Sequence, residues 1–166
     1  MSNTVNIGRR LIPLEQIALV EPFEQSADNP LWTDREFKSR ILLLNRDSVL
    51  AETEVALFTE QYGFRLLHED GVATNPDLHL SVEAFAPSKG FQPSKPYRSR
   101  LAWRDFDGNT QSRLLLSSPK NVVALAVRGE REPDSPEENS RSILKQSPSA
   151  RRKARKRATS KAPSPI

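Results

Sequence analysis

The sequence contains no cysteine and only two histidines, and its six glycines are scattered along the chain. Without cysteine there is no disulfide framework, no thiolate metal ligand and no cysteine nucleophile. Scattered glycines leave no phosphate-cradling loop, dinucleotide-binding fingerprint or nucleophile elbow. Because these absences remove the common sequence signatures of an enzyme, the sequence predicts a non-enzymatic protein without a cofactor or a metal.

Long apolar runs are also missing. No segment approaches the roughly 18 apolar residues that cross a bilayer, and the N-terminal segment MSNTVNIGRR lacks the apolar core of a signal peptide. The sequence therefore predicts a soluble, cytoplasmic protein that does not insert into a membrane.

Hydrophobic residues are few, at 36% of the chain against the roughly 45–50% of a typical globular domain, and 13 prolines are many for 166 residues. Residues 130–138 carry five acids and one arginine, and residues 141–161 carry nine Lys or Arg and no acid. The remaining residues, 1–129, have a net charge of −1. This distribution predicts a nearly neutral folded domain over residues 1–129 and a disordered, acidic-then-basic tail over residues 130–166.

The densest charge lies in the tail, where six of the seven residues 151–157 are cationic. Such a cluster neutralises phosphates and releases counterions, so it binds DNA or RNA strongly at low salt and without sequence specificity. A solubilising tail without a dedicated partner is the alternative that stays open. The candidate polyanion-binding residues are Arg151, Arg152, Lys153, Arg155, Lys156, Arg157 and Lys161.

Apolar patterning and turn residues predict an α+β, strand-rich domain. The sequence favours a hairpin turn at Asp107-Gly108, because glycine tolerates the positive φ of a tight turn. Residues 68–77 have no clear pattern and are expected to be irregular. Strands are expected at residues 9–13, 17–23, 37–45, 48–52, 78–85, 97–106 and 110–116.

Two helices are expected, one at residues 53–62 and one at residues 121–127. Thr53 is the predicted N-cap of the first helix, and Gly63 is its predicted stop. The second helix is expected to follow Ser118 as N-cap, with a proline at its first position.

The two halves of the domain share short sequence matches as well as the order of their elements. Residues 20–23 (VEPF) match residues 82–85 (VEAF), and residues 37–41 (FKSRI) match residues 97–101 (YRSRL). We interpret this as a duplicated three-strand-plus-helix unit, with halves at about 8–67 and 78–128. The apolar sheet faces of two such units are expected to pack on one another into a single core. Chance similarity between strand sequences is the alternative.

Glu21 and Glu83 hold equivalent positions in this repeat. They would serve as an acid–base pair only if they converged in one pocket. The favoured interpretation is that each pairs across the sheet with an arginine of the neighbouring strand, Arg40 or Arg100.

His68, Asp70 and His79 superficially match the two-histidine, one-carboxylate set of a non-haem iron site. The turn-like loop around the first two and the short spacing to the second histidine argue against a metal. The favoured interpretation is a solvated His68 and a partly buried His79 in a strand.

Strand alternation places Arg98, Arg100 and Arg104 on one face of the segment 97–106. The opposite face holds Leu101 and Trp103 and is expected to face the core. The three arginines are a candidate anion-binding face of the domain, but a solvated face balanced by the acids of the domain is the favoured interpretation.

Three segments carry a resemblance to known proteins: GRRLIPLEQIALVEPF, KSRILLLNRDSVL and PYRSRLAWRDFDGNTQSRLLL. Together with the basic tail they resemble a group of uncharacterised proteins from rhizobia and related alphaproteobacteria. The likeness covers most of residues 1–129. It rests on overall sequence similarity and includes no catalytic motif. It implies no activity and no functional residue, but it favours a bacterial cytoplasm.

The sequence thus predicts a non-enzymatic binding protein. Its tail is expected to contact nucleic acid, while its domain binds a protein partner or dimerises. A protein-interaction or scaffold domain with a solubilising tail is the alternative, and an enzyme without a recognisable motif is the third interpretation.

Overall fold

The computed structural model describes residues 3–26, 28 and 33–130. The chain divides into two compact units, Met1–Arg131 and Glu132–Ile166, and every described residue belongs to the first. The predicted tail therefore lies outside the described residues except for Glu130, whose N–H donates to the carbonyl of Ala124 at 2.8 Å. The seven candidate polyanion-binding residues lie outside them as well.

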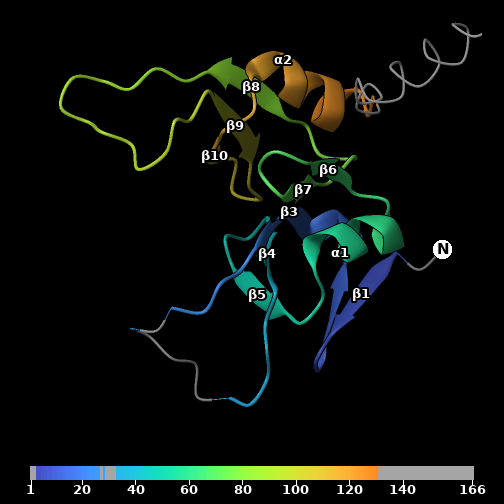
Figure 1. Cartoon of the computed structure of the whole chain (residues 1–166). Coiled ribbons are helices and arrows are strands. Elements are labelled where there is room, and N and C mark those ends of the chain that lie inside the picture. Colours follow the sequence, from blue (N-terminus) through green and yellow to red (C-terminus); the bar gives the residue numbers. More distant parts are fainter. Residues whose placement is uncertain (1–2, 27, 29–32, 131–166) are drawn as a thin grey trace, which may run out of the picture. The chain divides into compact units, whose positions relative to one another are not determined.

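The described chain has an α+β, strand-rich fold, as predicted, with ten strands in three antiparallel sheets and two short α-helices (Figure 1). The strands are β1 (Thr4–Ile7), β2 (Arg10–Pro13), β3 (Ile17–Pro22), β4 (Ser39–Leu43), β5 (Ser48–Ala51), β6 (Arg65–Leu67), β7 (Val72–Thr74), β8 (Ser81–Ala84), β9 (Ser99–Arg104) and β10 (Thr110–Leu115). The helices are the 3-10 turn η1 (Leu14–Gln16), α1 (Val55–Tyr62), α2 (Pro119–Val122) and the π-helical turn η2 (Val123–Val127). No helix within these ranges is long and apolar enough to cross a membrane.

The predicted repeat is present in the topology. The five-stranded sheet has the order β5-β4-β3-β7-β6, and the three-stranded sheet has the order β10-β9-β8. In both, three consecutive strands form an antiparallel meander that a helix follows. We call β3, β4, β5 and α1 the first repeat, and β8, β9, β10, α2 and η2 the second repeat.

The two repeats agree in register as well as in order. Glu21 lies opposite Arg40 in the first repeat, and Glu83 lies opposite Arg100 in the second. The same hydrogen bond closes each strand pair, from Phe23 N–H to Lys38 O and from Phe85 N–H to Arg98 O, at 3.0 Å in both. Chance similarity between strand sequences does not explain the same pairing register in both repeats. A shift of one residue would exchange the two faces of a strand, so the register is a specific feature.

The helices α1 and α2 begin at equivalent positions of the two repeats, after Glu54 and Ser118. The predicted N-cap of α1 is therefore corrected. The N-cap of α1 is Glu54, one residue after the predicted Thr53, because Glu54 is still extended at φ −67° and ψ 150°. Gly63 ends α1 in the left-handed conformation, at φ 71°, as predicted. Ser118 caps α2 as predicted, since its hydroxyl accepts from the N–H of Asn121.

The strands β1, β6 and β7 were not predicted. Residues 68–77, expected to be irregular, contain all of β7, whose three residues are buried between β3 and β6. A three-residue strand is too short to show a period of two, and the polar residues around it mask its burial. The predicted strand 78–85 starts only at Ser81.

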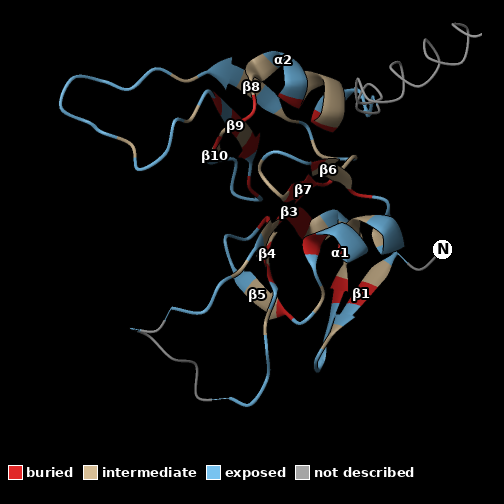
Figure 2. Ribbon diagram, in the orientation of Figure 1, coloured by how far each residue is buried: buried red, intermediate tan, exposed pale blue. Residues whose placement is uncertain are grey.

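The predicted single core between two sheet faces is wrong, because each repeat covers its inner sheet face with its own helix. In the first repeat Val20 and Ile41 pack with Phe58 of α1, and in the second Leu101 packs with Val122. A third cluster joins the repeats, in which the other face of β3 contacts Trp103 of β9. Figure 2 shows buried residues along β3, β4, β7 and β9.

Candidate functional site

The predicted arginine face lies on the solvent side of β9. Arg98, Arg100 and Arg104 are all exposed, while Leu101 and Trp103 are buried, so the predicted alternation is confirmed. Two of the three arginines have partners within the domain. Arg100 binds Glu83 at 3.1 Å, and Arg104 donates to the carbonyl of Gly108 at 2.8 Å.

Arg98 is the member of this face whose charge is open to solvent. Its backbone N–H donates to Leu115 O at 2.8 Å, and the described residues give its side chain neither an ion pair nor a hydrogen bond. The equivalent residue of the first repeat, Lys38, is bound to Glu54 at 3.3 Å. The same position is therefore neutralised in the first repeat and open in the second.

Aromatic side chains lie beside these cations. The guanidinium carbon of Arg100 lies 5.9 Å from the ring centre of Phe85, within the range of a cation–π contact. The ring of Phe85 meets the ring of Phe91 edge to face, with their centroids 6.5 Å apart. The segment between β8 and β9, residues 85–98, also carries two exposed lysines, Lys89 and Lys95. Cations and rings thus gather at one end of the three-stranded sheet.

Lys89, Lys95 and Phe85 were not predicted as members of this group. Their signal was present but weak, because a loop has no periodicity to show which residues share a face. We call the group formed by Phe85, Lys89, Phe91, Lys95, Arg98 and Arg100, together with Arg104 at the other end of β9, the basic face.

The charge of the domain is divided between its halves, although its sum is nearly zero. Residues 78–129 carry eight Lys or Arg and three Asp or Glu, a net charge of +5. Residues 1–77 carry seven Lys or Arg and thirteen Asp or Glu, a net charge of −6. The domain is therefore nearly neutral only as a whole, because its two halves carry opposite net charges. The basic face belongs to the positively charged half, residues 78–129.

The glutamates Glu21 and Glu83 form the predicted cross-strand ion pairs, at 3.6 Å to Arg40 and 3.1 Å to Arg100. Glu21 also has a shorter partner that the sequence did not indicate. The guanidinium of Arg113 in β10 donates to both its carboxylate oxygens, at 3.0 and 3.2 Å. This bidentate pair links the two repeats and occupies Glu21 fully.

The histidines and Asp70 do not form a metal site. The Asp70 carboxylate accepts hydrogen bonds from Leu116 N–H at 2.6 Å and from the Ser117 hydroxyl at 2.5 Å. His68 is exposed as predicted, but His79 is exposed and outside any strand, contrary to the prediction. No group of three His, Cys, Asp or Glu side chains with metal-binding geometry occurs in the described part of the chain.

A groove of about 570 Å³ lies beside the basic face. Its walls include His79, which precedes β8, Ser81 at the start of β8, and Trp103 and Arg104 from β9. It is open to solvent and mainly apolar, so it offers contact area next to the guanidinium of Arg104.

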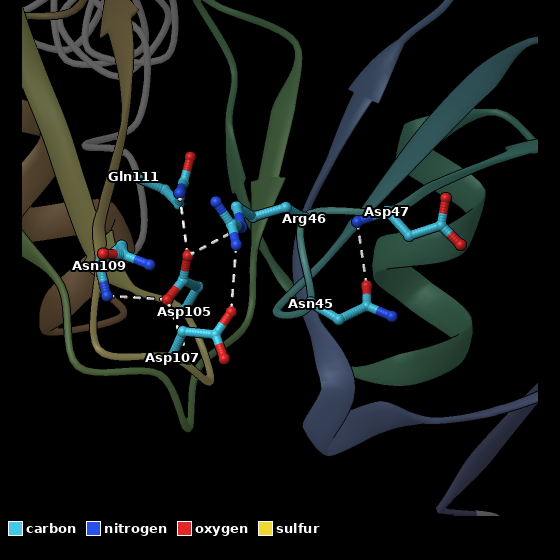
Figure 3. A network of polar contacts seen from close by, with 7 residues as sticks. All are labelled: Asn45, Arg46, Asp47, Asp105, Asp107, Asn109 and Gln111. Atoms are coloured by element: carbon cyan, nitrogen blue, oxygen red, sulfur yellow. Dashed lines mark hydrogen bonds and ion pairs between the residues drawn. The ribbon is translucent and has the colours of Figure 1, made fainter.

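The corresponding turns of the two repeats meet in a polar network (Figure 3). Arg46, in the β4–β5 turn, binds Asp105 at 3.4 Å and Asp107 at 3.1 Å, both in the β9–β10 turn. Arg46 adopts the left-handed conformation at φ 69°, which is unusual for a residue other than glycine. The ion pairs of Arg46 link the β4–β5 turn of the first repeat to the β9–β10 turn of the second.

Asp105 is the centre of this network, and its side chain is only 1% exposed. Burial alone would raise the pKa of its carboxyl. Hydrogen bonds from Asn109 N–H and the Gln111 amide, the charge of Arg46 and the N–H of Asp107 together outweigh burial and hold the pKa below its ordinary value.

Acid should therefore weaken the fold through Asp105. A carboxyl with a lowered folded pKa stabilises the fold above its unfolded value, near 3.8, and loses this effect as the pH falls through the folded value. We expect Asp105→Asn to lower the urea midpoint of unfolding at pH 7. The difference in midpoint between wild type and variant should become smaller below about pH 4. A difference in urea midpoint that stays constant down to about pH 2.5 would contradict the stabilising role of the Asp105 carboxylate.

Comparisons of the chain with protein-family models, with curated proteins and with solved structures found no match. The resemblance to proteins of rhizobia and related alphaproteobacteria stays a prediction. The case for a function consequently rests on the geometry and charge of the chain itself.

Proposed function

We propose that this protein is a cytoplasmic, non-enzymatic nucleic-acid-binding protein, in which the basic face and the basic tail contact the same class of ligand. The observation that carries the proposal is the separation of charge. The second half of the domain has a net charge of +5 beside an acidic first half, and the tail adds nine Lys or Arg over residues 141–161.

The basic face has the group types that recognise single-stranded nucleic acid. Guanidinium and ammonium groups bind phosphates, and exposed aromatic rings stack on bases. Phe91 is 50% exposed and lies against Phe85, which in turn contacts Arg100. Among the three arginines, Arg98 supports the proposal most strongly, because the described residues give its guanidinium neither an ion pair nor a hydrogen bond.

The tail supplies affinity of a different kind. Six cations within residues 151–157 form a dense point of phosphate contact with no means of reading bases. Any preference for single strands or for a sequence must therefore come from the basic face. The acidic first half would repel the backbone of the ligand and favour one orientation of the domain on it.

The experiment that tests this function is a titration of labelled oligonucleotides, single-stranded and duplex, followed by fluorescence anisotropy. It uses nuclease-treated protein, intact and with the seven tail cations changed to glutamine. Binding by the intact chain that weakens steeply with salt is the expected result. An intact chain that binds neither oligonucleotide at low salt would overturn the proposal.

The second candidate function is a protein-interaction domain with a solubilising tail. One observation favours it, an unpaired strand edge at β8. Retention of a protein partner after nuclease treatment, with no affinity for oligonucleotides, would establish it in place of the first.

A further inference from the structure

The strand β8 leaves one of its edges unpaired. It ends the order β10-β9-β8, and no other described strand lies on its outer side. Glu83 faces Arg100, and the next hydrogen bond along runs from Phe85 N–H to Arg98 O. Since antiparallel pairs alternate, the backbone groups of the intervening residue, Ala84, point away from β9, and those of Val82 do the same.

The first repeat shows what this edge accepts. Val20 of β3 is the equivalent of Val82, because each lies one residue before the paired glutamate. In β3 the outer edge is covered by β7, antiparallel, with Val20 opposite Ala73 and with Asn75 N–H donating to Ala18 O at 3.2 Å. Thus one chain contains the same edge twice, once covered by an antiparallel strand and once uncovered.

One other edge strand of the domain, β6, is covered. The side chain of Arg65 on β6 donates to the carbonyls of Ala126 and Val127 in η2, at 2.8 and 2.6 Å. The strand β8 (Ser81–Ala84) contains no lysine, proline or bulge, which are the usual devices against pairing with another chain.

We propose that β8 pairs antiparallel with β8 of a second copy of this chain, so that two three-stranded sheets become one six-stranded sheet. A strand paired with itself is antiparallel whenever a two-fold axis relates the copies, and this is the orientation that β7 takes on β3. With the axis beside Val82, Glu83 faces Ser81 of the second copy, so no like charges are opposed. Glu83 keeps its own partner, Arg100.

The side chains on the inner face also fit this pairing. Val82 and Leu80 pack against the cluster that contains Leu101 and Val122, so the same apolar cluster would continue across the axis. The edge is only four residues long. Contacts of this size are weak, so the dimer should form in a concentration-dependent manner.

The test is Ala84→Pro. Ala84 lies opposite Ser99 as Pro22 lies opposite Ser39, so the first repeat already carries a proline at this position. The substitution removes an N–H that points outward and leaves the bonds to β9 in place. The matched control is Ala84→Val, which keeps the N–H.

Molar mass is measured by light scattering on nuclease-treated full-length protein, from about 10 μM to about 1 mM, a range suited to a weak contact. Wild type and Ala84→Val should move from monomer to dimer, while Ala84→Pro stays monomeric with an unchanged melting curve. A wild type that is monomeric throughout, or an Ala84→Pro variant that dimerises equally, would disprove the pairing.

Hydrogen exchange keeps the inference testable if Ala84→Pro does not fold. In wild type, the amides of Val82 and Ala84 should exchange more slowly as the protein concentration rises. Unchanged exchange at both amides would also disprove the pairing. Neither measurement involves nucleic acid, so this inference and the proposed function stand or fall separately.

Discussion

Changing the seven cations of the tail to glutamine should lower the affinity for duplex DNA at low salt by about 100-fold to 1,000-fold. The residues changed are Arg151, Arg152, Lys153, Arg155, Lys156, Arg157 and Lys161. Each cation that neutralises a phosphate releases counterions, so its loss removes both affinity and salt dependence. The slope of log affinity against log salt should become shallower by up to about six.

The companion to this variant carries five charge changes in the acidic segment of the tail, residues 130–138. Five acids of residues 130–138 adjoin the basic cluster, and their change to glutamine should strengthen binding slightly by removing competition for the cations. The tail has no role in binding if its neutralisation leaves both the affinity and the salt slope unchanged.

Phe58→Ala should destabilise the whole domain by about 3–5 kcal/mol. Phe58 is 1% exposed, and its ring lies 5.1 Å from that of Phe64 and 4.6 Å from that of Tyr62. Val122 holds the equivalent place in the second repeat, since each N–H bonds to the carbonyl of its N-cap residue, at 2.9 and 3.0 Å. Val122→Ala removes less volume and should cost about 2 kcal/mol.

The measurement is urea unfolding followed by the fluorescence of Trp103, with Trp32 changed to phenylalanine so that one probe remains. Trp103 lies in the second repeat, and Phe58 lies in the first. Because Glu21–Arg113 and Arg46–Asp105 join the repeats, the Trp103 signal should report the full loss caused by Phe58→Ala. A Trp103 transition that does not move would show that the repeats unfold independently.

The parts of the fold that were predictable are those whose signal is local. The turn at Asp107-Gly108 and the cap at Ser118 depend on residues that are neighbours in the chain, and both were predicted. The repeat could be predicted because its two copies have the same residue types at the positions that set the register. Glu21 pairs with Arg40 in the first repeat, and Glu83 pairs with Arg100 in the second.

The features that were missed depend on distant or weakly patterned residues. Arg113 and Glu21 are 92 residues apart, and neither residue's neighbours indicate the pair. The strand β7 is three residues long, and its burial comes from its place between β3 and β6. The basic face was only partly predictable, because Lys89 and Lys95 lie in a loop where no period assigns a side.

The basic face also explains why a net charge near zero was misleading. Summed over residues 1–129 the charges cancel, but the repeat separates them in the fold, with acids in the first half and cations in the second. A ligand responds to the local field, so the relevant quantity is the charge of each half.

The most direct test of nucleic-acid binding by the second repeat is an NMR titration of the full-length protein with a short single-stranded oligonucleotide. Amide shifts should concentrate at Arg98, Arg100 and the lysines of the loop between β8 and β9. The equivalent positions of the first repeat, Lys38 and Arg40, serve as internal controls and should not shift. Shifts at Lys38 and Arg40 with none at Arg98 and Arg100 would contradict the proposal.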